Sequence, residues 1–348
     1  MTPPPVRVLV VDDSAFARKV LREALSTSPL IEVVGIARDG LEALEKIAEL
    51  KPDVVTLDLV MPNLDGLGVL QALPSQQMPR IVIVSVSDAD SELAVLALER
   101  GAIDLVHKPT ALATSRLYEL SAELIEKVLA AAAARQPLRE ELPPQPHPAA
   151  AHRPAESFRH STRRIVVVGT STGGPQALTR LLRDIPADFP VPIAIVLHIP
   201  FGYTEAMARR LNDLCALEVV ESSDGLVLRP GLVALGLAGQ HLRIEQSGGL
   251  LIARQDPVQG PFPHCPSVDV LFTSVAPMGR GVLGLVMTGM GDDGLQGSRR
   301  IVAAGGSVVT EGESSCIIYG MPRVVVEAGL SSGSAPLEAL ASLLSSRT

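Results

Sequence analysis

Short apolar runs alternate with amphipathic stretches through the first 130 residues. The stretches between the runs place apolar residues three and four positions apart, a spacing typical of helices with one buried face. The alternation predicts a doubly wound α/β domain over residues 1–130, in which helices cover a five-stranded parallel sheet. The apolar runs predict strands at Val6 to Val11, Ile31 to Ala37, Val54 to Leu57, Arg80 to Val84 and Ile103 to Val106.

A second set of apolar runs follows a segment of different composition. Residues 131–162 are rich in proline and alanine and lack apolar periodicity, so we expect an extended linker. Beyond this linker, the apolar runs Ile165 to Gly169, Ile193 to Leu197 and Leu285 to Met287 each lead into a turn. They predict a second α/β domain with a parallel sheet over residues 163–348.

Composition narrows the possible functions. The chain has 348 residues, 47% hydrophobic and 20% charged, which indicates a soluble protein of two domains. Because no run is long enough to span a bilayer and the start does not resemble a secretory signal, we expect a cytoplasmic protein without membrane insertion. A net charge of −8 and 3% aromatic residues argue against nucleic-acid binding. Three cysteines without a C-x-x-C pair indicate neither a disulfide framework nor a zinc site.

Polar residues follow the predicted strands of the first domain. Asp12 and Asp13 follow the first strand, Asp58 the third, Ser85 the fourth and Lys108 the fifth. Carboxyl ends of parallel strands share one edge of a sheet, so these side chains are expected to converge. Three carboxylates favour a hard divalent cation such as Mg²⁺, which keeps positions free for a phosphoryl group.

The alternative is that these acids only cap the helices that follow, as Asp13 or Ser14 would. Capping explains neither the lysine nor the concentration of acids at one edge. A phosphate acceptor site is therefore the favoured interpretation.

The first domain resembles the receiver domains of bacterial two-component systems, a flavodoxin-like fold. The resemblance rests on Val-Asp12-Asp13-Ser, Asp58-Leu-Val-Met-Pro-Asn-Leu-Asp-Gly, Ser85 and Lys108-Pro. It implies that a sensor histidine kinase donates a phosphoryl group to Asp58 and that Asp12, Asp13 and Asp58 hold Mg²⁺. It also implies that Lys108 pairs with the phosphate and that Ser85 is the switch hydroxyl. Val86 departs from the small residue usual after this hydroxyl, and we expect it to slow phosphoryl turnover.

In the second domain, an apolar strand runs into the glycine-rich turn Gly169-Thr-Ser171-Thr-Gly-Gly-Pro175. Such a turn either exposes Ser171 as a nucleophile or cradles a phosphate. The spacing matches neither G-x-G-x-x-G nor G-x-x-x-x-G-K-[ST], so the nucleophile is favoured.

A base and an acid are available at other strand ends. His198 follows one strand, and Asp292 and Asp293 lie in the glycine turn after another. A serine, an imidazole and a carboxylate make a hydrolytic triad, with backbone N–H groups around Thr172 and Met290 as candidates for an oxyanion site.

Less specific interpretations exist for each of these residues. A strand-end histidine is more often structural, and Asp292 or Asp293 could simply cap a helix. His264-Cys265 is a weak metal or thiol motif, and Cys316 lacks a histidine nearby in the sequence. The remaining histidines, His241 among them, are expected in exposed or linker settings without partners.

The second domain also resembles a family, the chemotaxis protein-glutamate methylesterases. The resemblance rests on the Ser171 turn, His198-Ile-Pro, Pro266-Ser-Val-Asp-Val-Leu-Phe, Thr288-Gly-Met-Gly-Asp-Asp-Gly and Tyr319-Gly-Met-Pro. It implies that Ser171, His198 and Asp293 form the triad, that Thr172 and Met290 line the oxyanion site, and that this domain needs no cofactor.

The implied activity is hydrolysis of glutamate methyl esters, and deamidation of glutamines, on chemoreceptor helices. A monomer at cytoplasmic receptor arrays is expected. Asp292 replaces a usual asparagine, Cys265 stands where a basic residue is expected, and the stretch from Ala238 to His241 lacks a familiar proline and aspartate. The alternative function is a phosphorylation-controlled module that binds a nucleotide or receptors without catalysis.

Overall fold

A computed structural model describes residues 4–74, 78–85, 90–108, 114–135, 164–257 and 264–348, with the backbone alone at 114–120. The chain divides into two compact units, Met1–Glu141 and Leu142–Thr348. Val86 and most of the predicted linker lie outside the described residues.

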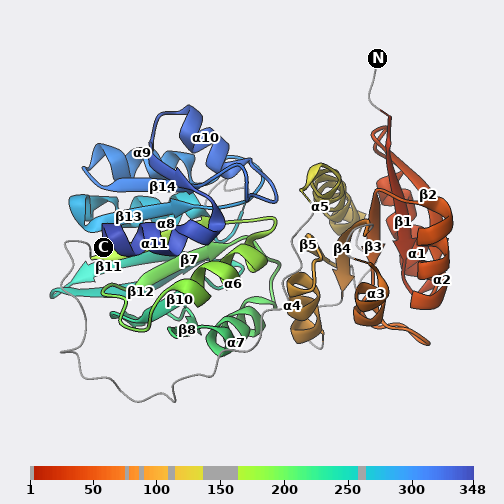
Figure 1. Ribbon diagram of the computed structural model, residues 1–348, viewed down its shortest axis with the longest axis horizontal. Helices are drawn as coiled ribbons and strands as arrows, with labels where there is room; N and C mark the ends of the chain where they lie inside the picture. The colour runs from red at the N-terminus through yellow and green to blue at the C-terminus, as the bar shows by residue number, and fades with distance from the viewer. Residues whose placement is uncertain (1–3, 75–77, 86–89, 109–113, 136–163, 258–263) are drawn as a thin grey trace. The chain divides into compact units, whose positions relative to one another are not determined.

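The first unit contains the predicted parallel sheet, with strand order β2-β1-β3-β4-β5 (Figure 1). The two later strands differ from the prediction by one residue at their ends, and the sheet interior is almost entirely apolar and buried. The strands are β1 (Val6–Val11), β2 (Ile31–Ala37), β3 (Val54–Leu57), β4 (Arg80–Ser85) and β5 (Asp104–His107).

Helices cover both faces of this sheet. Helices α1 and α5 contact each other on one face, whereas α2, α3 and α4 follow one another on the opposite face. Helix α5 extends three residues into the segment predicted as linker, because its last residues are alanines, the best helix formers. The helices are α1 (Ala15–Leu25), α2 (Gly40–Leu50), α3 (Gly66–Ala72), α4 (Ser91–Glu99) and α5 (Thr114–Ala133).

The second unit is built on a parallel sheet of seven strands, in the order β15-β14-β13-β6-β7-β10-β8. Strand β6 lies between β7 and β13, so the sheet reverses its direction of growth at β6. Ligand sites of α/β sheets form at such a reversal. The strands are β6 (Ile165–Thr170), β7 (Ile193–Leu197), β8 (Glu218–Glu221), β10 (Leu232–Leu235), β13 (Val282–Val286), β14 (Ser307–Glu311) and β15 (Ser331–Ala335).

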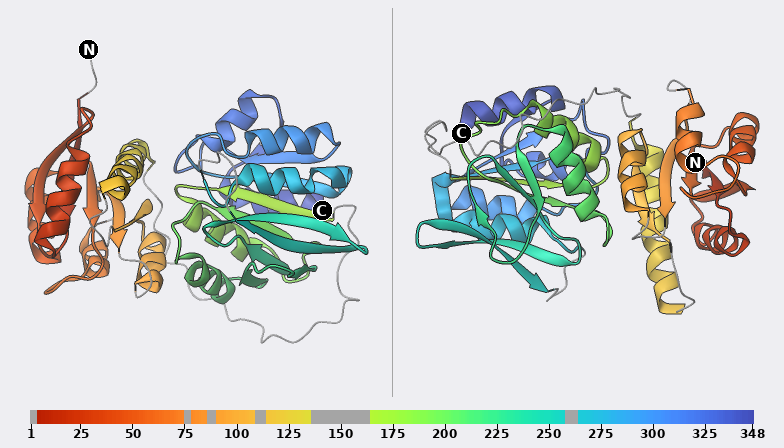
Figure 2. Two further views of the ribbon diagram at one scale, coloured as in Figure 1. Left: turned by 180° about the vertical axis from the view of Figure 1, so that it is seen from behind. Right: turned by 90° about the horizontal axis from the view of Figure 1, so that it is seen from below.

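Two groups of helices enclose this sheet. Helices α6, α7 and α11 lie on the near face in Figure 1, and α8, α9 and α10 lie on the other, which the left view of Figure 2 turns forward. The bounds are α6 (Gly174–Asp184), α7 (Thr204–Leu214), α8 (Val268–Val275), η2 (Ala276–Gly281), α9 (Leu295–Ala303), α10 (Met321–Glu327) and α11 (Leu337–Arg347). Within the described ranges, we find no helix with the length and apolarity needed to cross a bilayer.

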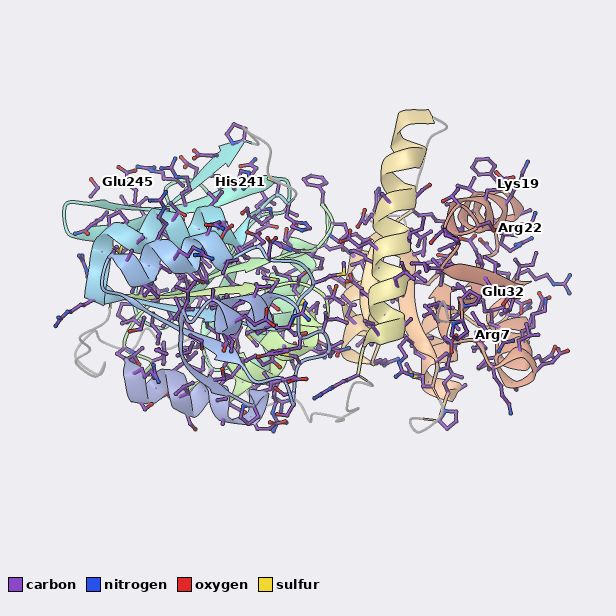
Figure 3. The ribbon with its side chains drawn as sticks, turned by 90° about the horizontal axis from the view of Figure 1, so that it is seen from above. Arg7, Lys19, Arg22, Glu32, His241 and Glu245 are labelled. Atoms are coloured by element: carbon purple, nitrogen blue, oxygen red, sulfur yellow. The ribbon has the colours of Figure 1, made fainter. Side chains whose placement is uncertain are left out.

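A three-stranded antiparallel sheet, which the sequence pattern did not predict, packs on α8. It consists of β9 (Val227–Leu228), β11 (Gln240–Ser247) and β12 (Leu250–Pro257). His241, labelled in Figure 3, begins the buried face of β11. The expectation that His241 is exposed and without a partner is wrong, because it is 3% exposed and its Nδ1 accepts the Ser267 N–H at 3.2 Å.

Candidate functional site

Acidic side chains gather at the carboxyl edge of the first sheet. Asp12 and Asp13 follow β1, and Asp58 follows the neighbouring strand β3. One carboxylate oxygen from each residue lies within 4.8 Å of the others. Three carboxylates are a hard oxygen donor set, which fits Mg²⁺. This cluster is therefore a typical Mg²⁺ site.

Lys108 joins the acidic cluster from the end of β5. Its Nζ lies 2.7 Å from Asp12 Oδ2 and 2.9 Å from Asp58 Oδ2. Burial raises the pKa of both carboxyls, and the lysine offsets only part of this effect. Burial alone would lower the pKa of Lys108, but its bonds to the two acids raise it. Two buried acids therefore share one cation.

The capping alternative is confirmed for Ser14, and Asp12 Oδ1 accepts the Ser14 N–H at 2.8 Å just before the helix. Ser14 is the N-cap of α1, since its Oγ accepts the Ala17 N–H at 3.3 Å. Asp13 is exposed beside it. Ser85 ends β4 fully buried, and its carbonyl accepts the Lys108 N–H at 2.7 Å.

The Ser171 turn has the predicted form of a strand leading directly into a helix. Strand β6 ends at Thr170, and α6 begins at Gly174, with Pro175 in its first turn. Gly173 has φ +78°, which glycine adopts without strain, and Gly174 donates its N–H to the Ser171 carbonyl at 2.7 Å. Ser171 remains partly exposed at the end of its strand.

His198 follows the neighbouring strand. Leu197 pairs with Thr170, and the His198 N–H donates to the Thr170 carbonyl at 3.0 Å. Adjacent strands lie about 4.8 Å apart, so Ser171 and His198 leave the sheet side by side. The His198 side chain is 8% exposed, and its Nε2 lies 2.9 Å from Asp293 Oδ2. Its Nδ1 is buried and has no hydrogen-bond partner in the described part of the chain.

Asp293 is held by more donors than His198 alone. Its Oδ2 also accepts the Val268 N–H at 2.8 Å, and its Oδ1 accepts the Asp269 N–H at 2.8 Å and the Ser267 hydroxyl at 2.9 Å. Burial alone would raise the pKa of Asp293. The bond to His198 and the two backbone N–H groups reverse this and lower it to about 2.

A neighbouring acid, Asp269, accepts backbone N–H groups from the segment that follows Asp293. Its Oδ1 accepts the Gly294 N–H at 3.0 Å and the Gly297 N–H at 2.6 Å at the start of α9. Each acid thus caps the helix beside the other. Burial raises the pKa of Asp269 to about 6, and the charge of Asp293 adds to the increase.

The adjacent acids Asp292 and Asp293 differ in their exposure to solvent. Asp292 faces solvent, whereas Asp293 is 8% exposed and contacts His198. The structure thus brings Asp293, and not Asp292, to the imidazole. The extra charge at Asp292 points into water.

Thr172 and Met290 flank Ser171 on two different turns. Thr172 is buried in the Ser171 turn, and Met290 lies in the turn after β13. Gly289 packs so closely on Ser171 that an added Cβ would lie 2.8 Å from the serine Cβ. In the described residues the Met290 N–H forms no hydrogen bond, so it can serve a substrate oxygen.

His264 and Ser267 belong to this site, although the sequence did not single them out for it. The His264 ring stacks on His198 with centroids 4.1 Å apart and planes inclined by 23°. Ser267 directly precedes an apolar run, which is a helix N-cap signature, but nothing in the sequence connects it to Asp293. Cys316 is buried, and Cys265 is partly exposed.

Comparisons with known proteins identify the families of both units. Residues 166–344 match the CheB methylesterase family, and residues 8–119 match the response regulator receiver domain. A protein-glutamate methylesterase/protein-glutamine glutaminase of Myxococcus xanthus is 61% identical, over 98% of this chain and 97% of the relative. One from Symbiobacterium thermophilum is 41% identical, over 97% of this chain and 95% of that relative.

A solved structure agrees with the fold of the second unit. The CheB methylesterase catalytic domain of Thermotoga maritima is 31% identical, with a TM-score of 0.53 over 54% of this chain and all of that domain. These relatives favour a hydrolase over a binding module without catalysis. The chain belongs to the CheB family of receiver-regulated protein-glutamate methylesterases and protein-glutamine glutaminases of chemotactic adaptation.

Proposed function

We propose that Ser171, His198 and Asp293 are the catalytic triad of this methylesterase. The observation that carries the proposal is the His198–Asp293 bond of 2.9 Å, which leaves Nδ1 as the ring atom without a partner among the described residues. Asp293 fixes the tautomer with the proton on Nε2, so Nδ1 can accept the proton of Ser171. The stacked His264 ring restricts rotation of the imidazole.

The reaction then follows acyl transfer in two steps. The Ser171 oxygen attacks the ester carbonyl as His198 takes its proton, and the Met290 and Thr172 N–H groups hold the oxyanion. The imidazolium gives this proton to the methoxy oxygen as its bond to carbon breaks, so methanol leaves; when a glutamine is the substrate, the amide nitrogen takes the proton and leaves as ammonia. Water then gives a proton to His198 and cleaves the glutamyl-serine ester, which restores Ser171. Asp293 stays ionised throughout, since its pKa lies near 2.

In the receiver, we infer that Asp58 accepts a phosphoryl group from a sensor histidine kinase. Asp12, Asp13 and Asp58 would hold Mg²⁺, which when bound neutralises charge on the phosphoryl group. Lys108, whose Nζ lies 2.9 Å from Asp58 Oδ2, would pair with a phosphoryl oxygen, and Ser85 at the end of β4 would bond another. We place the enzyme in the cytoplasm at receptor arrays, as a monomer acting on methylated chemoreceptor helices.

Covalent labelling tests the triad. A fluorophosphonate probe should modify Ser171, identified by peptide mass spectrometry, and Ser171→Ala should not react. Methanol release from methylated receptor membranes should fall by on the order of a million-fold in Ser171→Ala. Modification of another residue, or methanol release that survives in this variant, would show that the nucleophile is wrong.

Phosphorylation is tested separately. A small phosphodonor such as acetyl phosphate should label the wild-type chain in the presence of Mg²⁺, and Asp58→Asn should remain unlabelled. Labelling of the Asn variant to the same extent would remove Asp58 as the acceptor.

A further inference from the structure

Thr288 occupies a position behind the nucleophile that uses all its polar atoms. It follows β13 and is 1% exposed. Its carbonyl accepts the Ser171 N–H at 3.0 Å and the Thr170 hydroxyl at 2.7 Å. Its own hydroxyl donates to the Thr172 carbonyl at 3.0 Å and accepts the Ile318 N–H at 3.0 Å. One threonine thereby connects the residues before, at and after the nucleophile.

A buried acid holds Thr288 from the far side. The Thr288 N–H donates to Glu311 Oε2 at 2.9 Å, and the Ser315 hydroxyl donates to Oε1 at 2.9 Å. Glu311 ends β14 and is 0% exposed, and burial raises its pKa. Burying a carboxyl costs free energy unless donors satisfy its oxygens, so this acid is held in one orientation.

The network joins the ends of three parallel strands, β6, β13 and β14. Helix α6 begins at this turn without a side-chain cap from its N-cap residue, Gly173, and Gly173 itself has a positive φ, so the backbone of the turn alone does not fix it fully. A displacement of about 1 Å of a reacting group costs on the order of a hundredfold in rate. The bonds to Thr288 oppose such a displacement.

We propose that Thr288, held by the buried carboxyl of Glu311, is a positioning residue that fixes the Ser171 turn and thereby the reactivity of the serine. The proposal rests on Ser171 being the nucleophile. Thr288 touches no substrate and transfers no proton. Its effect is expected on the chemical step and not on receptor binding.

Two substitutions separate the hydroxyl from the shape of the side chain. Thr288→Val keeps the shape and loses the hydroxyl, whereas Thr288→Ser keeps the hydroxyl. We expect Val to lower the rate constant of fluorophosphonate labelling roughly ten- to a hundredfold. We expect kcat for methanol release to fall by a similar factor with KM unchanged. Ser should restore both rates to near the wild-type values.

Thr310 offers a matched control. It is a fully buried threonine of β14, and its hydroxyl bonds to Ser331 at 2.9 Å and Ser334 at 2.6 Å. Thr310→Val should lower Tm as Thr288→Val does, yet leave the labelling rate unchanged. If both valine variants slow labelling equally, general loss of stability explains the effect and the proposal fails.

The outcomes separate this proposal from the triad. If the wild-type chain is not labelled, the triad itself is wrong. If it is labelled and Thr288→Val reacts at the same rate, or Thr288→Ser reacts as slowly as Val, the positioning role is wrong. Should Thr288→Val fail to fold, Glu311→Ala removes the acceptor of the Thr288 N–H. An unchanged labelling rate in Glu311→Ala would equally overturn the proposal.

Discussion

The two units place acids at the same location, the carboxyl edge of a parallel sheet, in opposite electrostatic settings. In the receiver, Asp12 and Asp58 share one lysine, and burial raises the pKa of both. In the methylesterase unit, Asp293 accepts hydrogen bonds from two backbone N–H groups, one hydroxyl and one imidazole, and its pKa falls to about 2. Burial acts against the charge in both places, and the number of donors decides the outcome.

This difference separates two kinds of site. The receiver cluster has more negative charge than its protein partners balance, so it is suited to a divalent cation, which would in turn balance the charge of the proposed phosphoryl group. Asp293, the proposed triad aspartate, already has its hydrogen-bond donors in the absence of substrate, as preorganised catalysis requires. On this proposal, the carboxyl edge of the sheet carries a reversible switch in the first unit and a preorganised reaction centre in the second.

Removing the charge of Asp293 should have the largest effect of the changes considered for the two groups of acids. Asp293→Asn keeps the shape but presents an amide to His198, which disturbs the tautomer, so kcat should fall by on the order of ten-thousandfold. Methanol release from methylated receptors is the measurement. Asp292→Asn is the matched control, since Asp292 faces solvent, and its rate should match the wild type. A greater loss in Asp292→Asn would exchange the roles of the two acids.

Removal of divalent metal should separate the units. With a chelator present, phosphorylation of Asp58 by acetyl phosphate should fall roughly a hundredfold or more, because Lys108 alone does not balance three carboxylates and an incoming phosphoryl group. Basal ester hydrolysis by the unphosphorylated chain should not change, because the triad supplies its own base and oxyanion donors. Added Mg²⁺ should restore phosphorylation alone. A chelator that stops basal hydrolysis would contradict the proposed division.

Many residues of both candidate sites could be predicted from the sequence because the end of an apolar run marks the end of a buried strand. An apolar run followed by Asp58, Ser171 or His198 fixes each residue at the carboxyl edge once the sheet is known to be parallel. Strand limits agreed within one residue in the first unit. The sequence alone could not choose between Asp292 and Asp293, since both follow the same strand and only the local turn decides which is buried.

The contacts between distant segments could not be predicted. His241 reaches Ser267, and Thr288 reaches Glu311, through bonds that depend on how strands and loops are paired in space. Such bonds leave no periodic signal in the sequence. The strands β9, β11 and β12 were missed for another reason. Strand β9 has only two residues, and β11 and β12 carry many polar residues because much of their length is exposed or half-buried, so they lack the continuous apolar run of the central strands.

The stability of the methylesterase unit should depend on the ionisation of Asp293 at acid pH. The folded pKa of Asp293 is about 2 and its ordinary value is 3.8, so its contribution is present above pH 3.8 and lost as pH falls toward 2. The shift corresponds to about 2 kcal/mol. Hydrogen exchange of β13 peptides between pH 5 and 2 is the measurement, after correction for intrinsic rates. The loss should be smaller in Asp293→Asn, and an identical pH dependence would contradict the assignment.

The smallest expected effect concerns Glu311. It lies in the methylesterase unit, yet burial raises its pKa, as burial does for Asp12 and Asp58 in the receiver. A folded pKa above the ordinary value means that stability falls as pH rises above that ordinary value, so the carboxyl group of Glu311 costs stability at neutral pH. Glu311→Gln removes that cost while its amide oxygen still accepts the Thr288 N–H and its amide group donates to the Ser315 hydroxyl. We expect Tm at pH 7.5 to rise by about 2 °C with labelling of Ser171 unchanged. The gain should vanish as the pH is lowered and Glu311 becomes protonated. A lower Tm at pH 7.5 would mean that the charge of Glu311 stabilises this site. It would contradict the view that burial opposes the charge of an acid that has few hydrogen-bond donors.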